Sequence, residues 1–328
     1  MPRANGTLAA PFPNPPPMNP LWIDTDMGFD DLAAVLAVAG TPGWSVAGLS
    51  LVAGNAPLTV VVDNALRAAA CFGWRFPIHA GAAGPLVGEL ATAQSVLGDD
   101  AMVSAGRSLP RERTALTSED AVGALADWLR ASPAPVTVLA LGPLTNIALL
   151  LQRHPDLAPR IVELMWMGGS AGPGNHTAAA EFNAIVDPES INEVLAAGVP
   201  LAMVGLDTCR QVRVDKADAD ALRALGTDRG VLLGDLLEGY VRIAGPDGRS
   251  AMALYDPTAA AALLAPGSVR FTPAHLVAEC RGEHTRGMTV VEWRVPRKAA
   301  ANARIATTAD AATVRAAVLG ALAVAARS

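Results

Sequence analysis

Short apolar runs and stretches with helical spacing alternate along most of the chain. Runs rich in Val, Ile and Leu predict buried strands, because the strands of a parallel sheet are covered on both faces. The segments between these runs repeat apolar residues at helical spacing, which is typical of strand–helix–strand units. The predicted strands are 21–23, 46–52, 136–141, 161–167 and 201–206, and the predicted helices are 30–39, 58–72, 119–131, 144–153 and 188–197.

This alternation predicts an open, mostly parallel, Rossmann-like α/β sheet flanked by helices. After residue 207 the pattern changes to long Ala- and Leu-rich helices with a few strand-like segments. The elements expected there are helices at 216–225 and 231–243, a polar loop at 245–249, a helix after 256, strands at 276–279 and 288–294, and a last helix at 309–325. No linker separates this part, so we expect a single domain with C-terminal helical and small β additions.

The first twenty residues contain seven prolines, which predicts an extended, flexible leader. This segment has no apolar core of the kind that signal peptides carry. We therefore divide the chain into a Pro-rich leader over 1–20 and one domain over 21–328. No run approaches the ~20 uninterrupted apolar residues of a membrane span, so we expect no membrane partner.

Composition narrows the class of partner. The chain has 25 Lys and Arg against 31 Asp and Glu, a formal charge of −6, which gives no electrostatic basis for binding nucleic acid. A small-molecule substrate is expected instead. Cys71, Cys209 and Cys280 are widely spaced and form no metal-binding or disulfide pattern, which favours the cytoplasm.

Four carboxylates crowd into eight residues directly after the first predicted strand, at Asp24, Asp26, Asp30 and Asp31. Like charges at this density require a counter-charge, and no Lys or Arg occurs between Arg3 and the distant Arg67. Oxygen ligands without nearby His or Cys favour a hard cation, Ca²⁺ or Mg²⁺. The alternative is a helix cap flanked by solvated acids.

Other strand ends also carry Gly or polar residues, namely Gly54-Asn55, Gly142-Pro143, Gly168-Gly169 and Asp207. Since ligands of open parallel sheets bind outside the carboxyl ends of the strands, these positions are expected to converge on one crevice.

In this motif and in several that follow it, the chain resembles the nucleoside hydrolases, the calcium-dependent inosine/uridine-type N-ribohydrolases. The stretch 24–31, Asp-Thr-Asp-Met-Gly-Phe-Asp-Asp, is similar to their DxDxGxDD signature. Further motifs match in the same order: Val-Ala-Gly-Asn at 52–55, Leu-Gly-Pro-Leu-Thr-Asn at 141–146, Met-Gly-Gly at 167–169, Gly-Asn at 174–175, Ala-Glu-Phe-Asn at 180–183, Val-Asp-Pro-Glu at 186–189 and Gly-Leu-Asp at 205–207.

The resemblance implies a Ca²⁺ site and a hydrolytic mechanism. It assigns Asp26 as metal ligand and general base for a water, and Asp31, Asp256 and the carbonyl of Leu141 as further ligands. Asp24 is implied to support this group. The resemblance further implies that ribonucleosides are cleaved to base and ribose through an oxocarbenium-like transition state, by a homodimer or homotetramer.

By the same resemblance, a second group of residues holds the substrate. The implied contacts are Asp30 and Asn55 on the 2′/3′ side of the ribose, Asn175, Glu181 and Asn183 on its 3′ and 5′ side, and Met167 beneath the ring. Phe182 and Trp166 are interpreted as core residues, and among the histidines only His176 is expected near the pocket.

The chain differs from some family members at two positions that are expected to contact the nucleobase. Some members place a histidine immediately before the last metal-binding Asp, where this chain has Tyr255, and another near Leu97. An aromatic residue at the first position occurs in purine-preferring members, so Tyr255 favours a purine and is expected to stack on or hydrogen-bond to the base.

Two other functions fit parts of the pattern. Asp24 and Asp26 could be the nucleophile and acid of an aspartate-based phosphatase, although no positioned Lys for phosphate is recognisable. A ribonucleoside- or ribose-binding protein without turnover is the other alternative, since both expected histidines are missing.

Overall fold

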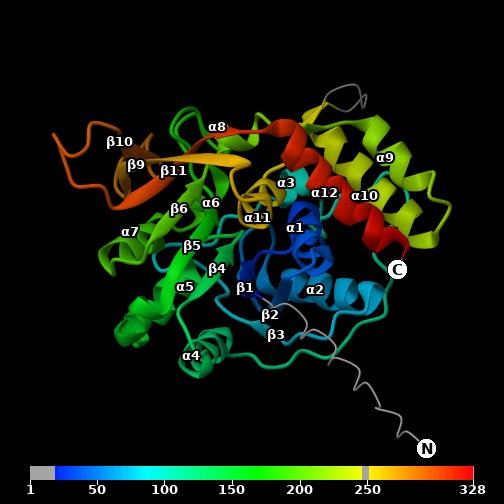
Figure 1. Cartoon of the computed structure of the whole chain (residues 1–328), viewed down its shortest axis with the longest axis horizontal. Helices are drawn as coiled ribbons and strands as arrows, with labels where there is room; N and C mark the ends of the chain where they lie inside the picture. The colour runs from blue at the N-terminus through cyan, green and yellow to red at the C-terminus, as the bar shows by residue number, and fades with distance from the viewer. Residues whose placement is uncertain (1–18, 246–250, 328) are drawn as a thin grey trace, which may run out of the picture.

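The computed structural model describes residues 19–245 and 251–327 (Figure 1). Most of the expected leader and of the polar loop at 245–249 lies outside these residues. None of the described helices combines the length and the apolar character needed to cross a membrane.

A nine-stranded sheet runs through the centre of the described chain (Figure 1). Its strand order is β10-β9-β11-β6-β5-β4-β1-β2-β3. The strands are β1 (Asn19–Thr25), β2 (Trp44–Leu51), β3 (Ile78–Ala80), β4 (Val136–Ala140), β5 (Ile161–Met167), β6 (Leu201–Val204), β9 (Val269–Ala278), β10 (Thr289–Glu292) and β11 (Ala303–Ala309). A separate pair joins β7 (Arg213–Val214) and β8 (Met252–Ala253).

Strands β1 to β6 are parallel to one another and lie in the sheet in the order 3-2-1-4-5-6. This is the doubly wound order, in which successive strands are added outward from β1 in one direction and from β4 in the other. The carboxyl ends of β1 and β4 therefore mark the point where the strand order reverses.

Helices lie on both faces of the sheet. The described α-helices are α1 (Phe29–Gly40), α2 (Leu58–Phe72), α3 (Gln94–Leu97), α4 (Ala121–Ala131), α5 (Thr145–Arg153), α6 (Phe182–Val186), α7 (Pro188–Ala196), α8 (Leu206–Cys209), α9 (Lys216–Arg223), α10 (Asp228–Ala244), α11 (Asp256–Leu264) and α12 (Ala311–Arg327), of which α9 packs on α10 and α12. Alternate residues of β1 show the two layers: Leu21 and Ile23 pack into a core with α1, α2, α10, α11 and α12, whereas Trp22 packs into a core with α4, α5 and α7.

The predicted fold class and the five predicted strands are confirmed. The sequence pattern missed β3, which has only three residues, and β11, which lies inside the sheet between β6 and β9. It also started β9 too late. Pro273 interrupts the apolar run there, yet β9 continues through it, because β10 pairs only with residues 275–278 and β9 is therefore an edge strand at Pro273.

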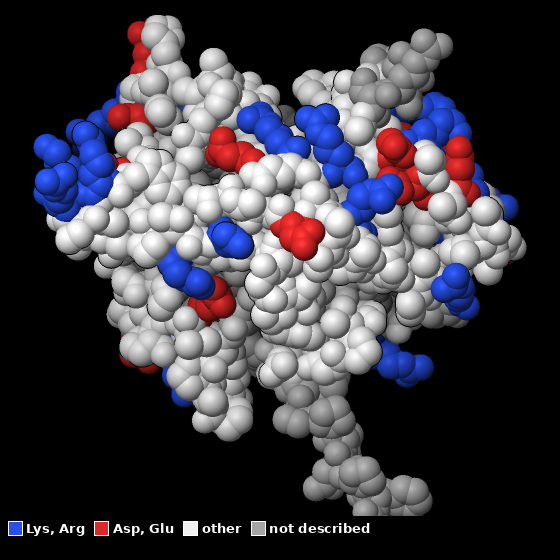
Figure 2. Space-filling model, turned by 45° about the horizontal axis from the view of Figure 1, so that its top comes forward, with Lys and Arg blue, Asp and Glu red and all other residues white. Residues whose placement is uncertain are grey.

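Charges on the surface are mixed. On the face that Figure 2 shows, Lys and Arg side chains are interspersed with Asp and Glu and separated by uncharged surface. This face presents no continuous basic surface to a polyanion.

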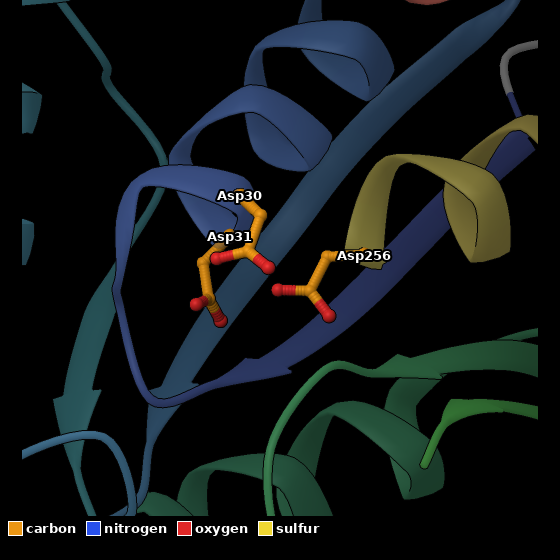
Figure 3. Close-up of side chains that lie close together, drawn as sticks. All are labelled: Asp30, Asp31 and Asp256. Atoms are coloured by element: carbon orange, nitrogen blue, oxygen red, sulfur yellow. The ribbon is translucent and has the colours of Figure 1, made fainter. Parts of the chain in front are cut away.

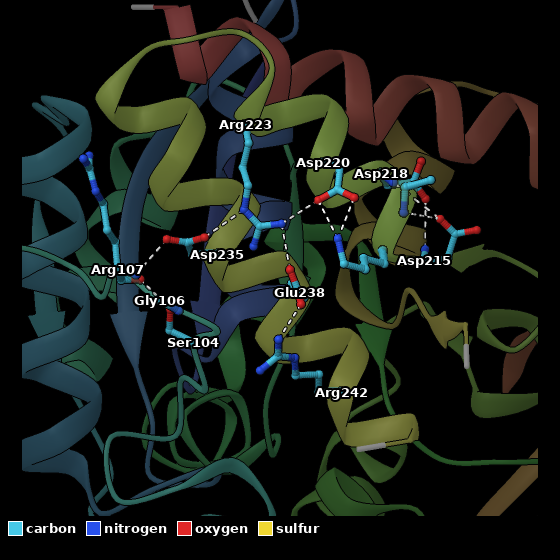
Figure 4. A network of polar contacts seen from close by, with 12 residues as sticks. Ser104, Gly106, Arg107, Asp215, Asp218, Asp220, Arg223, Asp235, Glu238 and Arg242 are labelled. Carbon is cyan, nitrogen blue, oxygen red and sulfur yellow. Dashed lines mark hydrogen bonds and ion pairs between the residues drawn. The ribbon is translucent and has the colours of Figure 1, made fainter. Parts of the chain in front are cut away.

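Helix α10 is held by a network of ion pairs (Figure 4). Arg223 at the end of α9 contacts Asp235 Oδ1 through Nε at 2.8 Å and Glu238 Oε2 through Nη1 at 2.7 Å. Asp235 also accepts a hydrogen bond from the backbone nitrogen of Arg107 at 2.8 Å. The network therefore ties α10 both to α9 and to the chain that follows α3.

Gly239 brings α10 and Val103 closer than any side chain allows, because a Cβ at Gly239 would overlap the carbonyl oxygen of Val103. We expect Gly239→Ala to lower the free energy of unfolding by about 1–3 kcal/mol through overpacking. Gly320 in α12 has open space around its Cα, so Gly320→Ala should instead raise stability by roughly 0.5–1 kcal/mol. Urea unfolding of both variants checks the pair, and equal changes would contradict the close approach.

Candidate active site

A cavity of about 240 Å³ opens at the carboxyl ends of the central strands. Its polar wall consists of Asp26, Asp30, Asn55, Asn175, Glu181, Asn183 and Asp256. The remaining wall consists of Ala93, Val96, Leu97, Leu141, Met167, His176, Phe182, Tyr240, Ile243, Met252 and Tyr255. All residues predicted for the site line this cavity except Asp24 and Asp31, which are fully buried beside it.

A tight turn after β1 brings the acids of the 24–31 motif together. Met27 adopts φ +38°, a left-handed conformation that is unfavourable for a residue with a side chain. Its nitrogen donates to Thr25 Oγ1 at 3.1 Å, and its carbonyl accepts from Asn64 Nδ2 at 3.2 Å. These bonds hold the strained turn that leads from Asp26 into α1.

Two hydrogen bonds from Asn55, in the loop after β2, hold the carboxylate of Asp26. Asn55 donates its backbone nitrogen to Asp26 Oδ2 at 2.7 Å and its Nδ2 to Oδ1 at 3.0 Å. Gly54 makes this approach possible, since a Cβ there would overlap Asp26 Oδ2. The Gly-Asn pair predicted from the sequence thus fixes the carboxylate of Asp26.

Asp31 is bound on both oxygens. Thr25 Oγ1 donates to Oδ1 at 2.5 Å, and the backbone nitrogen of Gly28 donates to Oδ2 at 2.8 Å, so the carboxylate also caps the start of α1. The alternative interpretation, that an acid of this motif caps a helix, is therefore correct for Asp31. It does not describe its neighbours, which belong to a larger acidic cluster.

Asp30, Asp31 and Asp256 converge although Asp256 is more than two hundred residues away in the chain. One carboxylate oxygen of each lies within 4.8 Å of the others, and Figure 3 shows the three groups turned toward one another. Asp31 also lies within hydrogen-bonding reach of Asp26. The four acids therefore form one contiguous cluster.

Burial raises the pKa of every acid in the cluster. The pKa of Asp30 rises to about 7 through desolvation and the charge of Asp31, and the pKa values of Asp26 and Asp256 rise well above their usual range for the same two reasons. Desolvation also raises the pKa of Asp31. None of the ion pairs among residues 19–245 and 251–327 involves these acids. Their charged forms therefore lack a counter-ion among the residues that the structure describes.

The donor set suits a hard divalent cation. Carboxylate and carbonyl oxygens are the ligands that Ca²⁺ and Mg²⁺ prefer, and a cation would supply the missing positive charge. The carbonyl of Leu141 accepts from Asn183 Nδ2 at 2.8 Å, which leaves its second lone pair available.

Asp24 lies beneath the cluster and is fully buried. Its Oδ1 accepts from Ser50 Oγ and, at 2.8 Å, from Asn146 Nδ2, while its Oδ2 has no hydrogen-bond partner within 19–245 and 251–327. Desolvation raises the pKa of Asp24 to about 7. Asn146 also donates to the carbonyl of Leu51 and accepts from the nitrogen of Ala82, so it joins three strand ends behind the cavity.

Glu181 is the N-cap of α6, and Asn183 lies in the first turn of this helix. The carboxylate of Glu181 accepts from the nitrogens of Gly169, Asn183 and Ala184 at 2.8–3.0 Å. Desolvation nevertheless raises the pKa of Glu181 to about 7. Asn183 Nδ2 additionally donates to the carbonyl of Met167 at 3.1 Å.

The loop that carries Asn175 is fastened from α8. Arg210 donates to the carbonyls of Pro173 at 3.0 Å and Gly174 at 2.9 Å, and Asp207 Oδ2 accepts from the nitrogen of Ala171 at 2.6 Å. Asp207, marked in the sequence as a polar strand-end residue, thus supports the site from outside the cavity.

Aromatic and apolar residues complete the wall. Tyr255 and Leu97, which stand at the expected histidine positions, both line the cavity. The prediction for His176 is confirmed. Phe182 is buried, as its interpretation as a core residue implies, but it also lines the cavity and packs on His176 with ring centroids 5.5 Å apart. Trp166 is a core residue as predicted.

Sequence reasoning missed Tyr240, Ile243 and Met252. Their helix and strand, α10 and β8, match no recognised motif, and only packing brings them to the cavity. One signal was available. The chain contains two tyrosines, and both line this cavity.

The acidic cluster predicts how stability depends on pH without metal. Between the usual carboxyl pKa of 3.8 and about 7, the folded protein holds protons that the unfolded chain has released. The free energy of unfolding should therefore fall as pH rises through this window, by up to about 1.4 kcal/mol per pH unit for each such group.

A bound divalent cation favours the ionised acids, so the increase in Tm on replacing EDTA with CaCl₂ should be larger at pH 8 than at pH 5. Asp256→Asn should raise Tm in EDTA at pH 8 and reduce the response to CaCl₂. Thermal unfolding checks both, and equal CaCl₂ responses at the two pH values would contradict the cluster as a cation site.

Comparison with known proteins agrees with this geometry. The family described as inosine-uridine preferring nucleoside hydrolase matches residues 21–316. The pyrimidine-specific ribonucleoside hydrolase RihA of Shewanella woodyi is 38% identical over 83% of this chain and 88% of its own length. The protein of the same name from Citrobacter koseri is 35% identical over 84% and 88%.

Solved structures share the fold. A purine-preferring ribonucleoside hydrolase from Gardnerella vaginalis superposes with a TM-score of 0.86 at 24% identity, covering 94% of this chain and 99% of that one. An inosine-guanosine nucleoside hydrolase gives a TM-score of 0.84 at 25% identity, covering 93% and 98%. The chain therefore belongs to the inosine-uridine preferring nucleoside hydrolases, a family of enzymes.

Proposed function

We propose that this protein cleaves the N-glycosidic bond of ribonucleosides by water, releasing base and ribose, with Asp26 as general base. The observation that carries the proposal is one cavity in which clustered acids and amide side chains stand beside an apolar and aromatic wall. Such a cavity can hold a sugar by its hydroxyls and a flat base by its faces.

The proposed cation is Ca²⁺, held by Asp26, Asp31, Asp256 and the carbonyl of Leu141. Ca²⁺ accepts about six to eight oxygens, more than these residues supply, which leaves places for water and sugar hydroxyls. When bound, the cation would orient a water molecule and lower its pKa. Asp24, with its unpartnered oxygen, supports this shell from below.

In the proposed reaction the water oxygen attacks C1′ while the bond between C1′ and the base nitrogen breaks. Asp26 takes a proton from the water, and the base leaves with the bonding electron pair and acquires a proton. The two bonds from Asn55 hold the carboxylate of Asp26 in one orientation for this transfer.

The ribose passes through an oxocarbenium-like state, so tighter contacts to its hydroxyls in that state lower the barrier. We assign Asp30 and Asn55 to the 2′/3′ side, and Asn175, Glu181 and Asn183 to the 3′ and 5′ side. Met167 lies beneath the ring. Each of these six residues lines the cavity.

Purified protein with CaCl₂ should release reducing sugar from at least one of inosine, adenosine, guanosine, uridine and cytidine. Asp26→Asn keeps the shape of the side chain and removes the proposed general base, so kcat should fall by about 10²–10⁴-fold. Asp63→Asn is the control, because Asp63 pairs with Arg67 and Arg113 away from the cavity. No release from any nucleoside would overturn the proposed activity.

Two observations bear on the preferred base, and they favour different classes. Tyr255 favours a purine through stacking, as expected from the sequence. The relatives at 35–38% identity are named pyrimidine-specific, which favours uridine or cytidine. Since either ring offers a face to Tyr255, we propose that stacking is the contact that both classes share.

Tyr255→Phe should therefore retain kcat/KM within about threefold, because the ring remains. Tyr255→Ala should lower kcat/KM about tenfold or more. The pKa of Tyr255 is raised to about 12, chiefly by burial, which makes its hydroxyl a poor proton donor. A loss with Tyr255→Phe as large as that with Tyr255→Ala would show that the hydroxyl, and not the ring, acts on the base.

The phosphatase alternative finds little support in the site. Among the described residues that line the cavity there is no Lys or Arg to bind a phosphate group. Phosphate release with Mg²⁺ that depends on Asp24 but not on Asp26 would favour it.

We further propose that the enzyme acts in the cytoplasm as a homodimer or homotetramer, with a leader over 1–20 and one catalytic domain over 21–328. The three free cysteines are consistent with a reducing compartment.

A further inference from the structure

Tyr240 connects three parts of the cavity that are far apart in sequence. It lies on α10 and is only 4% exposed, with its ring packed against Phe29 at 5.4 Å. Its hydroxyl lies 2.8 Å from the carbonyl oxygen of Ala253 in β8 and 3.3 Å from Asp30 Oδ2 at the start of α1. β8 leads directly into Tyr255 and Asp256.

The acids of the cluster differ in what holds them. Asp26 is fixed by Asn55, and Asp31 by Thr25 and the nitrogen of Gly28. For Asp30, Tyr240 is the side-chain partner that the described residues provide. Without that hydroxyl, the donors to the carboxylate of Asp30 among the described residues would be the backbone nitrogens of Asp30 and Asp31, so its orientation would be less firmly fixed.

This orientation matters because Asp30 is close enough to join the cation site. Its carboxylate forms the 4.8 Å group with Asp31 and Asp256 (Figure 3). A carboxylate that ligates the cation accepts fewer hydrogen bonds from sugar hydroxyls, since its lone pairs are shared between the two.

We propose that Tyr240 is a positioning residue that holds one oxygen of Asp30, so that this carboxylate stays directed to the 2′/3′ hydroxyls of the ribose. The cavity thereby distinguishes ribose from 2-deoxyribose. This inference rests on the function proposed above and adds a specificity-determining residue to it.

The hydroxyl can serve this role although it has one proton and two acceptors within reach. Burial raises the pKa of Tyr240 well above its usual range, so the group stays a donor. Its single proton is shared between the two acceptors, with the shorter contact to the carbonyl of Ala253 at 2.8 Å and the longer one to Asp30 Oδ2 at 3.3 Å. Ionisation of Asp30 strengthens the longer contact, because charge-assisted hydrogen bonds are about twice as strong as neutral ones.

The test compares Tyr240→Phe with the wild type, because this variant removes one oxygen and retains the contact with Phe29. Binding of ribose and of 2-deoxyribose is measured by calorimetry in CaCl₂. We expect Tyr240→Phe to weaken ribose binding about tenfold and 2-deoxyribose binding less than threefold. With nucleosides, kcat/KM should fall by a similar factor.

Calcium affinity supplies a second readout that does not depend on turnover. If Tyr240 positions Asp30 for the sugar and does not support the cation site, Tyr240→Phe should bind Ca²⁺ as tightly as the wild type or more tightly. A tenfold weaker affinity would overturn the proposal, since it would mean that Tyr240 supports the cation site itself.

A double-mutant cycle separates positioning from general support of the cavity. If Tyr240 acts through Asp30, Tyr240→Phe should change ribose binding less than twofold once Asp30→Asn is present. Tyr255→Phe, the only other tyrosine substitution the chain permits, is the matched control and should have the same effect in both backgrounds.

The outcomes keep the two proposals apart. If nucleosides are hydrolysed but Tyr240→Phe binds ribose like the wild type, the positioning role is overturned and the activity stands. If no nucleoside is hydrolysed but ribose binding responds as expected, the activity fails and the role of Tyr240 in sugar selection is supported.

Discussion

The structure depends most on the crowding of buried carboxylates at the end of β1. Asp26, Asp30, Asp31 and Asp256 lie in one cluster, desolvated and without a basic partner among the described residues. Burying several like charges is costly unless hydrogen bonds and a counter-charge compensate. The surrounding architecture supplies the hydrogen bonds, and the oxygen-rich donor set is suited to a hard cation that would supply the charge.

The compensating donors come from different strands, which explains why the site lies where the strand order reverses. Thr25 is the last residue of β1, Gly28 lies in the turn after it, and Asn55 follows β2. Asn146 follows β4 and reaches Asp24 from behind. Only at the reversal point do these strand ends meet in one crevice, so the topology and the electrostatics of the site have the same origin.

The rest of the cavity is built by the C-terminal additions. Helix α10 carries Tyr240 and Ile243, and the ion pairs of Arg223 with Asp235 and Glu238 fix that helix against α9 (Figure 4). Asp235 also binds the chain after α3, the helix that contributes Val96 and Leu97. The apolar and aromatic wall of the cavity is thus built from segments that are distant in the chain and are brought together by tertiary contacts.

Strand periodicity and short motifs are local properties of the chain, so the parallel sheet, the acidic turn and the Gly-Asn pair at 54–55 could be predicted from the sequence. The family resemblance also assigned the residues of the polar wall, and these residues do line one cavity. The positions of β11, Phe182 and Tyr240 could be recognised only in the folded chain. Their roles come from contacts between residues distant in the chain, which no local pattern records.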